Sequence, residues 1–210
     1  MNNYSEMESV KLDGGEYGGT YKLIGEQVCF DFTNTVAWRD TDGAHDWLSS
    51  PENFLTWSLA AKTISKPAAD SLRHRSGVQS AKEMKTVIKI REELRELLAP
   101  IAFDKKPDPA LIKNFELLLQ SISGLRHIHP SSFEWVWNPP KTLVEAVAPV
   151  IWNAAEVLTQ SDHSRVRHCA GCDWLFYDST RNRSRKWCDM GDCGSRDKSL
   201  RYYHRKKEEN

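Results

Sequence analysis

Apolar residues recur at intervals of three and four positions over most of the first 160 residues, a spacing that brings them onto one face of an α-helix. The most regular stretch is 80–101. Its apolar positions at helical spacing are Met84, Val87, Ile88, Leu94, Leu97, Leu98 and Ile101. This segment predicts a long amphipathic helix with one buried face.

Two further helices are predicted from the residues that would begin them. Ser50 can cap the free N–H groups of a helix, Pro51 suits the first turn, and Glu52 faces the positive end of the helix dipole. We expect this helix to end near residue 62. Asp108 and Pro109 begin another helix in the same way. The apolar face expected for it is Leu111, Ile112, Phe115, Leu118, Leu119 and Ile122.

Three less regular patterns complete this part of the chain. The mixed apolar segment 27–37 predicts a helix that opens the fold, although its β-branched residues lower the helix propensity. Residues 125–129 and 133–137 alternate in the manner of strands around a turn, which predicts a small β-hairpin. A last helix is expected over 141–158, with a bend at Pro149. The predicted fold class is therefore mainly α, a helical domain with a small β-hairpin.

Charge and cysteine are unevenly distributed and divide the 210-residue chain near residue 160. Residues 1–160 contain 17 basic and 21 acidic side chains, a net charge of −4, whereas residues 161–210 contain 12 basic and 8 acidic ones, a net charge of +4. Four of the five cysteines also lie after residue 160. We therefore predict a helical domain over 1–160 and a small C-terminal module over 161–210.

The sequence lacks the common signals of a secreted protein, of a membrane-spanning protein and of several enzyme classes. The first 19 residues lack the basic and apolar order of a secretion signal, and no apolar run approaches the roughly 20 residues that cross a bilayer. These absences predict a cytoplasmic protein that does not contact a membrane. The chain also lacks the motifs GxxxxGK[ST], GxGxxG, GxSxG and HExxH, so we expect no enzymatic activity and no catalytic residues.

Cysteine spacing carries the strongest chemical signal. Two residues separate Cys169 from Cys172, fifteen separate Cys172 from Cys188, and four separate Cys188 from Cys193. Two such pairs can surround one ion with four thiolates, the closed tetrahedral geometry of a structural zinc site. Disulfides are the alternative, but they belong to oxidising compartments. We predict one structural Zn²⁺, and we expect the fifth cysteine, Cys29, to be a buried apolar residue.

The residues around these cysteines predict a small α+β module of the treble-clef or ribbon-like type. We expect strands over 165–169 and 174–177, a returning strand over 181–188, and a helix over 195–207. The apolar residues available for a local core are Trp174, Phe176, Trp187 and Leu200. Because the module is too small for a core of its own, its folding should depend on the metal.

Basic residues surround the predicted metal site. On the C-terminal helix, Lys198, Arg201 and Arg205 fall within an arc of about 60°, with Leu200 and Tyr203 on the opposite, packed face. The further cations of the module that we assign to nucleic acid are Arg181, Arg183, Arg185, Lys186 and Arg196. A zinc module with one cationic surface is suited to binding phosphates. Some of these cations could instead compensate the thiolates, contact a protein, or be solvated surface.

The C-terminal residues resemble a known family. The run CAGCDWLFYDSTRNRSRKWCDMGDCGSRDKSLRYYHRKK (169–207) is similar to the C-terminal zinc finger of bacterial proteins named after a Cys-Gly-Asn-Arg motif, the CGNR-type zinc finger. In this chain the motif reads Cys193, Gly194, Ser195 and Arg196. Serine in place of asparagine leaves the metal ligand and the arginine intact and remains a competent helix cap.

The N-terminal part resembles the partner domain of that family, called ABATE, through the segment VCFDFTNT (28–35) and the following Arg39. Together the two resemblances imply a stress-induced transcription regulator of bacterial type, with a helical N-terminal domain and a finger that contacts DNA. The polar residues of the matched segment are Asp31, Asn34, Thr35 and Arg39. They could line the pocket of a small-molecule effector, or Asp31 and Arg39 could form a structural ion pair, which is the alternative that we favour.

The function predicted from the sequence is DNA binding in transcription regulation by a zinc-finger protein. The N-terminal domain could sense a ligand or form a homodimer. The alternative is a module that binds RNA or protein and uses the finger as a contact surface. The tryptophans are expected in the core, where they could also line an aromatic pocket.

Overall fold

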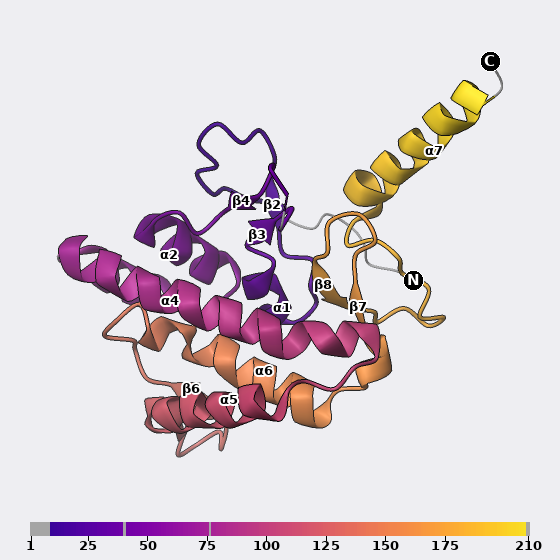
Figure 1. Cartoon of the computed structure of the whole chain (residues 1–210). Coiled ribbons are helices and arrows are strands. Elements are labelled where there is room, and N and C mark those ends of the chain that lie inside the picture. The colour runs from indigo at the N-terminus through magenta and orange to yellow at the C-terminus, as the bar shows by residue number, and fades with distance from the viewer. Residues whose placement is uncertain (1–8, 40, 76, 209–210) are drawn as a thin grey trace.

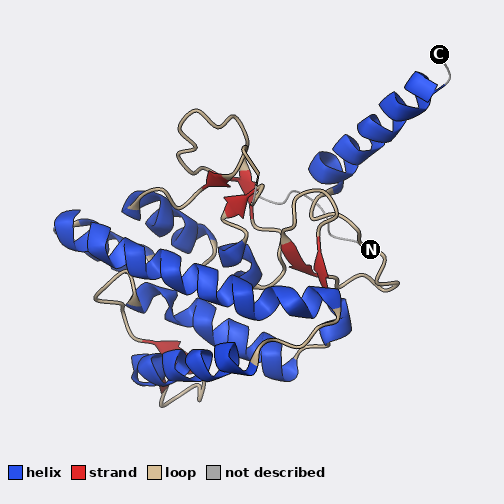
Figure 2. Ribbon diagram, in the orientation of Figure 1, coloured by secondary structure: helices blue, strands red, loops and turns tan. Residues whose placement is uncertain are grey.

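The computed structural model describes residues 9–39, 41–75 and 77–208. A long helix, α4, crosses the molecule; α1, α2, α5 and α6 pack against it, and α1 packs against α6 as well (Figure 1). The bounds of these helices are α1 Val28–Thr33, α2 Pro51–Ala60, α4 Gly77–Leu98, α5 Pro109–Ile122 and α6 Ala148–Gln160. The mainly α fold class is confirmed, since the strands of the described residues form only small two-stranded sheets (Figure 2).

The predicted helix starts are confirmed by their capping bonds. The Ser50 side chain accepts a hydrogen bond from the Asn53 backbone N–H at 3.1 Å, and Asp108 accepts one from Ala110 at 2.7 Å. Helix α3 (Lys66–Arg73) was not predicted, although Ser65 caps it and a proline lies in its first turn. The same serine and proline signal could have identified it.

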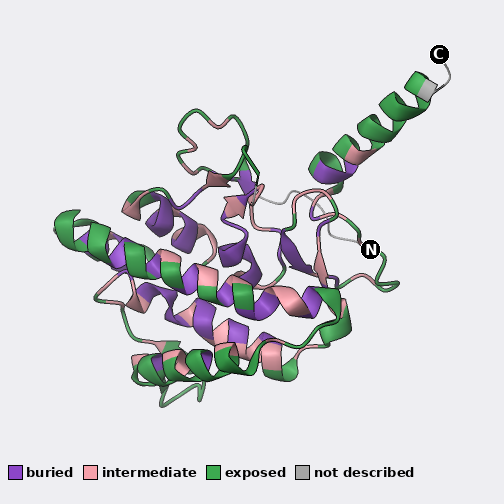
Figure 3. Ribbon diagram, in the orientation of Figure 1, coloured by how far each residue is buried: buried purple, intermediate pink, exposed green. Residues whose placement is uncertain are grey.

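Three of the predicted helices have different bounds or faces. The segment 27–37 is helical only to Thr33, and Val36–Ala37 forms a strand, β3, against β4 (His45–Asp46). Helix α6 begins at Ala148, so Pro149 lies in its first turn, where a missing N–H costs nothing, and does not bend it. On α5 only Phe115 and Ile122 are buried, because this helix lies on the outside of the bundle (Figure 3).

The small sheets are all antiparallel pairs. The predicted hairpin is confirmed as β5 (Arg126–Ile128) and β6 (Trp135–Trp137). Near the N-terminus, β1 (Ser9–Val10) pairs with β2 (Tyr21–Lys22). In the C-terminal module β7 (Val166–His168) pairs with β8 (Leu175–Tyr177), as the sequence predicts.

One continuous core joins the helical part to the β7–β8 hairpin. Leu175 and Phe176 are fully buried, and they belong to the same apolar cluster as Phe30 and Val150 of the helical part. The final helix, α7 (Ser195–Glu208), extends away from this body into solvent (Figure 1). Among the described residues, no helix is both long and apolar enough to span a membrane.

Candidate metal centre and the surfaces around it

The four cysteines predicted as ligands converge at one point. All four sulfur atoms lie within 4.8 Å of one another. The Sγ atoms of Cys172 and Cys188 are 3.5 Å apart, and those of Cys188 and Cys193 are 3.6 Å apart. Four thiolates at a Zn–S distance of about 2.3 Å occupy the corners of a tetrahedron with edges of about 3.8 Å. The sulfurs therefore have the spacing that a bound zinc ion requires.

Local backbone geometry presents the first pair. The two cysteines lie in the turn between β7 and β8, where Asp173 has a positive φ of 59° and closes the turn with a hydrogen bond to the Cys169 carbonyl at 3.1 Å. The Gly171 N–H donates to the Cys169 sulfur at 3.4 Å. A Cβ at Gly171 would lie 3.2 Å from the Cβ of Cys193, so glycine is what lets the turn approach the second pair.

The second pair reaches the same point from the start of α7. Cys188 ends an irregular loop, and Cys193 lies in the single π-turn Met190–Gly194 that leads directly into the helix. The Ser195 hydroxyl donates to the Met190 carbonyl at 3.2 Å, so the serine in the motif's asparagine position joins the first residue of α7 to this turn. A hairpin knuckle combined with a ligand at a helix N-terminus is the treble-clef arrangement that the sequence predicts.

The chemistry of the cluster fits one structural zinc ion. All of its cysteines are free thiols, three of the four are buried, and no other side chain joins the set among the described residues. Hydrogen bonds from Cys172, Cys188 and Cys193 hold the pKa of the Cys169 thiol well below its usual range. Four protein ligands complete the coordination of zinc and leave no position for a reacting water, so the metal stabilises the fold.

The loop between the two pairs is not the returning strand that we expected over 181–188. It is irregular and is held by the buried Asp178 carboxylate, which accepts hydrogen bonds from Thr180 and from the Arg185 backbone N–H. Burial opposes ionisation of Asp178, but these hydrogen bonds outweigh it and hold the pKa below its usual value. Arg183 adopts a positive φ of 49°, which a regular strand does not allow.

Arg185 is a correction to the predicted nucleic-acid surface. Its side chain is only 8% exposed and lies over the Phe176 ring at 4.3 Å. The guanidinium donates to Glu26 at 2.6 Å and to the Ile24 carbonyl at 2.9 Å. Arg185 therefore attaches the ligand loop to the helical part and cannot reach a nucleic acid. Arg183 remains at the surface, but it is paired with Asp162 at 2.9 Å.

Polar residues of the helical part perform the same attachment from the other side. Asn34 is fully buried, and its amide both donates to the Leu175 carbonyl at 2.7 Å and accepts from the Leu175 N–H at 2.8 Å. The side chain thus pairs with the edge of β8 as a strand would. Asp31 accepts hydrogen bonds from the N–H groups of Ile24 and Gly25 at 2.9 and 2.8 Å.

The expected ion pair between Asp31 and Arg39 is wrong. Arg39 pairs with Glu92 and donates to the Thr33 carbonyl at 3.0 Å. Thr35 is buried and accepts a hydrogen bond from Arg91 at 3.2 Å. All four polar residues of this segment are therefore engaged in internal bonds, which favours a structural role for them over a ligand pocket.

Helix α7 differs from the prediction on one face. We expected Leu200 and Tyr203 to be packed, but they are 53% and 62% exposed. Every side chain described on α7 except Asp197 is exposed, because only the first turn contacts the rest of the protein (Figure 3). The cations Lys198, Arg201 and Arg205 are all at the surface, and Arg201 pairs with Asp197 at 2.6 Å. Arg181, Lys186 and Arg196 are exposed as well.

Lys22 is an interface residue that the sequence did not reveal. Its ammonium bonds Asp189, which caps the π-turn, at 2.7 Å and Asp192, within that turn, at 2.8 Å. Burial opposes ionisation of Asp189, yet the bond to Lys22 outweighs it and lowers the pKa of that carboxyl. No spacing pattern relates position 22 to positions 189 and 192, so only the folded structure shows this contact.

The fold and the site define a mainly helical protein with a four-cysteine zinc finger at its C-terminal end. Residues 26–161 match the ABATE family, described as a "putative stress-induced transcription regulator", and residues 165–206 match the CGNR zinc finger. The chain belongs to the ABATE family and carries the CGNR finger after that domain, as the sequence motifs indicate. No curated protein matches the chain.

Proposed function

We propose that this protein regulates transcription by binding DNA through α7 and the exposed cations beside it. The single observation that carries the proposal is a basic helix that begins at the metal centre and is exposed along its length. Its cations are Arg196, Lys198, Arg201, Arg205, Lys206 and Lys207. A helix that is solvated on every side is suited to contacting a partner rather than to filling a core.

The dimensions of α7 support duplex DNA as that partner. Its 14 residues give a length of about 21 Å at 1.5 Å per residue. The major groove is about 12 Å wide and accepts one α-helix. The metal centre and the π-turn fix the first turn of α7, so the helix is presented to the groove in one orientation. Phosphate contacts would supply the affinity, and arginines reaching base edges would supply the specificity.

Salt dependence of DNA binding tests the proposal. The affinity of the zinc-loaded protein for a random-sequence duplex should fall steeply with salt. Replacing Lys198, Arg201 and Arg205 by alanine should lower the slope of log K against log [salt] by up to about 2.7, which is about 0.9 for each phosphate that is no longer neutralised. Recovery of genomic fragments by the variant should fall in parallel.

Helix α4 provides a matched control. Lys82, Lys85 and Lys89 are exposed on it, and their replacement by alanine changes the net charge by the same amount. This control should bind DNA as the natural protein does. Equal losses in both variants, or a flat salt response of the natural protein, would contradict DNA binding through α7.

A second candidate is contact with protein, and the exposed apolar side chains of α7 favour it. Leu200, Tyr202 and Tyr203 are each more than half exposed. They could pack against another protein or against a second copy of the chain, which would give the predicted homodimer. Sedimentation of the zinc-loaded protein would detect that dimer. A cytoplasmic location and the lack of catalysis stay predictions from the sequence.

A further inference from the structure

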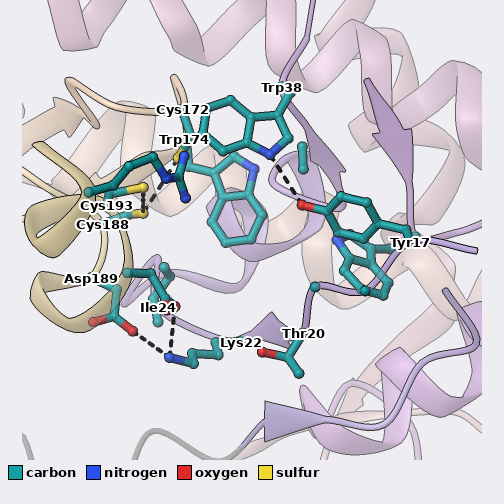
Figure 4. Close-up of a pocket in the computed structure, with 16 residues that line it drawn as sticks. Tyr17, Thr20, Lys22, Ile24, Trp38, Cys172, Trp174, Cys188, Asp189 and Cys193 are labelled. Carbon is teal, nitrogen blue, oxygen red and sulfur yellow. Dashed lines mark hydrogen bonds and ion pairs between the residues drawn. The ribbon is translucent and has the colours of Figure 1, made fainter. Parts of the chain in front are cut away.

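A cavity of about 300 Å³ lies between the helical part and the zinc finger (Figure 4). Its walls come from the loop before β2, from the β3–β4 turn, from the metal centre and from the first turn of α7. Figure 4 shows Trp38, Trp174 and Tyr17 around the space, with Cys188 and Cys193 at one end. Its volume is at the lower end of the range for small-molecule sites.

One part of the cavity wall is aromatic, and the indole N–H groups of Trp38 and Trp174 there are already hydrogen-bonded. The Trp38 indole N–H donates to the Tyr17 hydroxyl at 3.1 Å, and the Trp174 indole N–H donates to the Val36 carbonyl at 2.9 Å. Trp47 completes the wall behind Tyr17, with ring centroids 5.3 Å apart. The cavity therefore presents ring surfaces, which bind another planar ring by stacking or edge contacts.

Trp38 is held in an unfavourable backbone conformation at this position. Its φ is 54°, in the left-handed region that costs an ordinary residue about 1–2 kcal/mol. Residues strained in this way cluster at ligand sites, where the surrounding structure keeps them in place. Six other described non-glycine residues share this region of φ, among them Asp173 and Arg183, so the strain of Trp38 supports a ligand site only together with the cavity.

Arg196 is the cation at the cavity that no described carboxylate engages. Lys22 is engaged by Asp189 and Asp192, so these three groups bind one another. The Arg196 guanidinium lies 4.3 Å from the centre of the Trp38 ring and has no carboxylate partner among the described residues. An arginine that stacks on an aromatic ring keeps its N–H groups available for a carboxylate, which it binds in bidentate fashion.

We propose that this cavity binds a planar aromatic carboxylate, with its ring among Tyr17, Trp38 and Trp174 and its carboxylate on Arg196. Because Arg196 is the second residue of α7, the bound ligand ties the start of that helix to the helical part. It also withholds one cation from phosphate. The effect of the ligand on DNA binding, the regulatory half of the proposal, rests on the proposed function, whereas binding of the ligand itself does not.

Calorimetry with three probes of one shape tests the site on the full-length zinc-loaded protein. The probes are 2-naphthoate, 2-naphthylmethanol and 2-naphthylmethylammonium. We expect 2-naphthoate to bind about tenfold or more tightly than the other two, because only a carboxylate forms charge-assisted hydrogen bonds with Arg196. No binding of 2-naphthoate at millimolar concentration, or equal affinity for all three probes, would overturn the proposal.

Matched variants locate the binding. Arg196→Gln and Trp38→Leu should each weaken 2-naphthoate binding about tenfold, while Trp38→Phe, which keeps a ring, should weaken it less. The controls are Arg201→Gln on the same helix and Trp135→Leu, whose ring is 57% exposed in the distant hairpin. Zinc content and circular dichroism verify that each variant is folded. Equal losses in variants and controls would place the probe elsewhere and refute the site.

DNA binding then tests the regulatory half separately. Saturating 2-naphthoate should reduce the salt slope of DNA binding by about 0.9, the share of one phosphate contact. An unchanged slope would refute the coupling while the calorimetric result stands. If the protein binds no DNA at all, the proposed function fails, and calorimetry alone still decides whether the cavity is a ligand site.

Discussion

The two halves of the zinc finger share one metal centre but are held by different forces. The β7–β8 hairpin is part of the main core, with Leu175 and Phe176 fully buried. Helix α7 is exposed along its length, with Leu200 53% exposed. The hairpin therefore gains its stability from apolar burial, whereas α7 depends on the ligands at its N-terminus.

Within this small module, the residues that stabilise the fold are therefore different from those that we assign to binding. Two side chains of the helical part, Asn34 and Lys22, attach the finger to it, and Arg185 of the finger points into the helical part. The cations of α7 that we assign to DNA take no part in that attachment, apart from Arg196 at the cavity. Changes on α7 should therefore alter binding without unfolding the protein, and changes at the attachment should do the reverse.

The largest expected effect is loss of the metal by Cys188→Ser. We expect the zinc content to fall from one ion per chain to a small fraction, because structural zinc contributes on the order of 10 kcal/mol through four thiolates. Hydrogen exchange should show residues 189–208 losing their protection, while residues 166–177 keep most of theirs. Elemental analysis and exchange measured on the same sample check both expectations.

Cys29 supplies the control for that experiment. It is fully buried in α1, far from the other cysteines in sequence, and burial raises the pKa of its thiol. Cys29→Ala should keep the zinc content at one ion per chain. Loss of protection in the β7–β8 hairpin of Cys188→Ser equal to the loss in α7 would refute the contrast between the two halves.

The next largest effect is expected for Asn34→Ala. This change leaves the buried N–H and C=O of Leu175 without partners, and each unsatisfied group costs about 1–3 kcal/mol. We expect the free energy of unfolding to fall by about 2–4 kcal/mol in a denaturant titration. Asn114→Ala on the exposed face of α5 is the control and should change stability by less than about 0.5 kcal/mol.

Local signals in the sequence were sufficient for much of this fold. Ser50 and Asp108 cap the helices that they were predicted to begin, because a cap involves only residues two or three positions away. The metal site was predictable for the same reason, since the spacing within each cysteine pair limits how its sulfurs can be placed. The helix that follows Ser65 was equally predictable, because a serine cap and a proline in the first turn mark its start as well.

Long-range partners could not be predicted in this way. Asn34 bonds a residue 141 positions away, and Arg185 bonds one 159 positions away. A single sequence shows that such residues are polar or charged but does not identify their partners. This is why Arg185 was assigned to nucleic acid and Asp31 to Arg39. The prediction that Leu200 is packed was wrong for a second reason, because helical spacing defines a face of the helix without showing whether anything covers that face.

A smaller, pH-dependent effect is expected from Asp31. Burial raises the pKa of this carboxyl from 3.8 to about 7, against the opposing hydrogen bonds from Gly25 and Ile24 and the nearby charge of Arg185. Folding therefore favours the protonated form. The resulting stabilisation is complete below the unfolded pKa and is lost as the pH rises through about 7.

The variant Asp31→Asn isolates this contribution. The free energy of unfolding of the natural protein, taken relative to the variant, should fall by about 2 kcal/mol between pH 5 and pH 7. Zinc-ligand protonation affects both proteins alike and cancels in the difference. A difference that is constant with pH, or that rises, would show that Asp31 is ionised throughout and that its hydrogen bonds outweigh burial.

The smallest effect is expected on α7 itself, and it is the most direct test of the contrast between the halves. Leu200→Ala should change the free energy of unfolding by less than about 0.5 kcal/mol, because the side chain is exposed and leucine and alanine are both good helix formers. Leu175→Ala, the same change in the buried hairpin, should cost about 2–5 kcal/mol. A cost above about 1 kcal/mol for Leu200→Ala would mean that this face of α7 is covered in solution. If that cost disappeared on dilution, the covering surface would be a second copy of the chain, and the second candidate function would gain support.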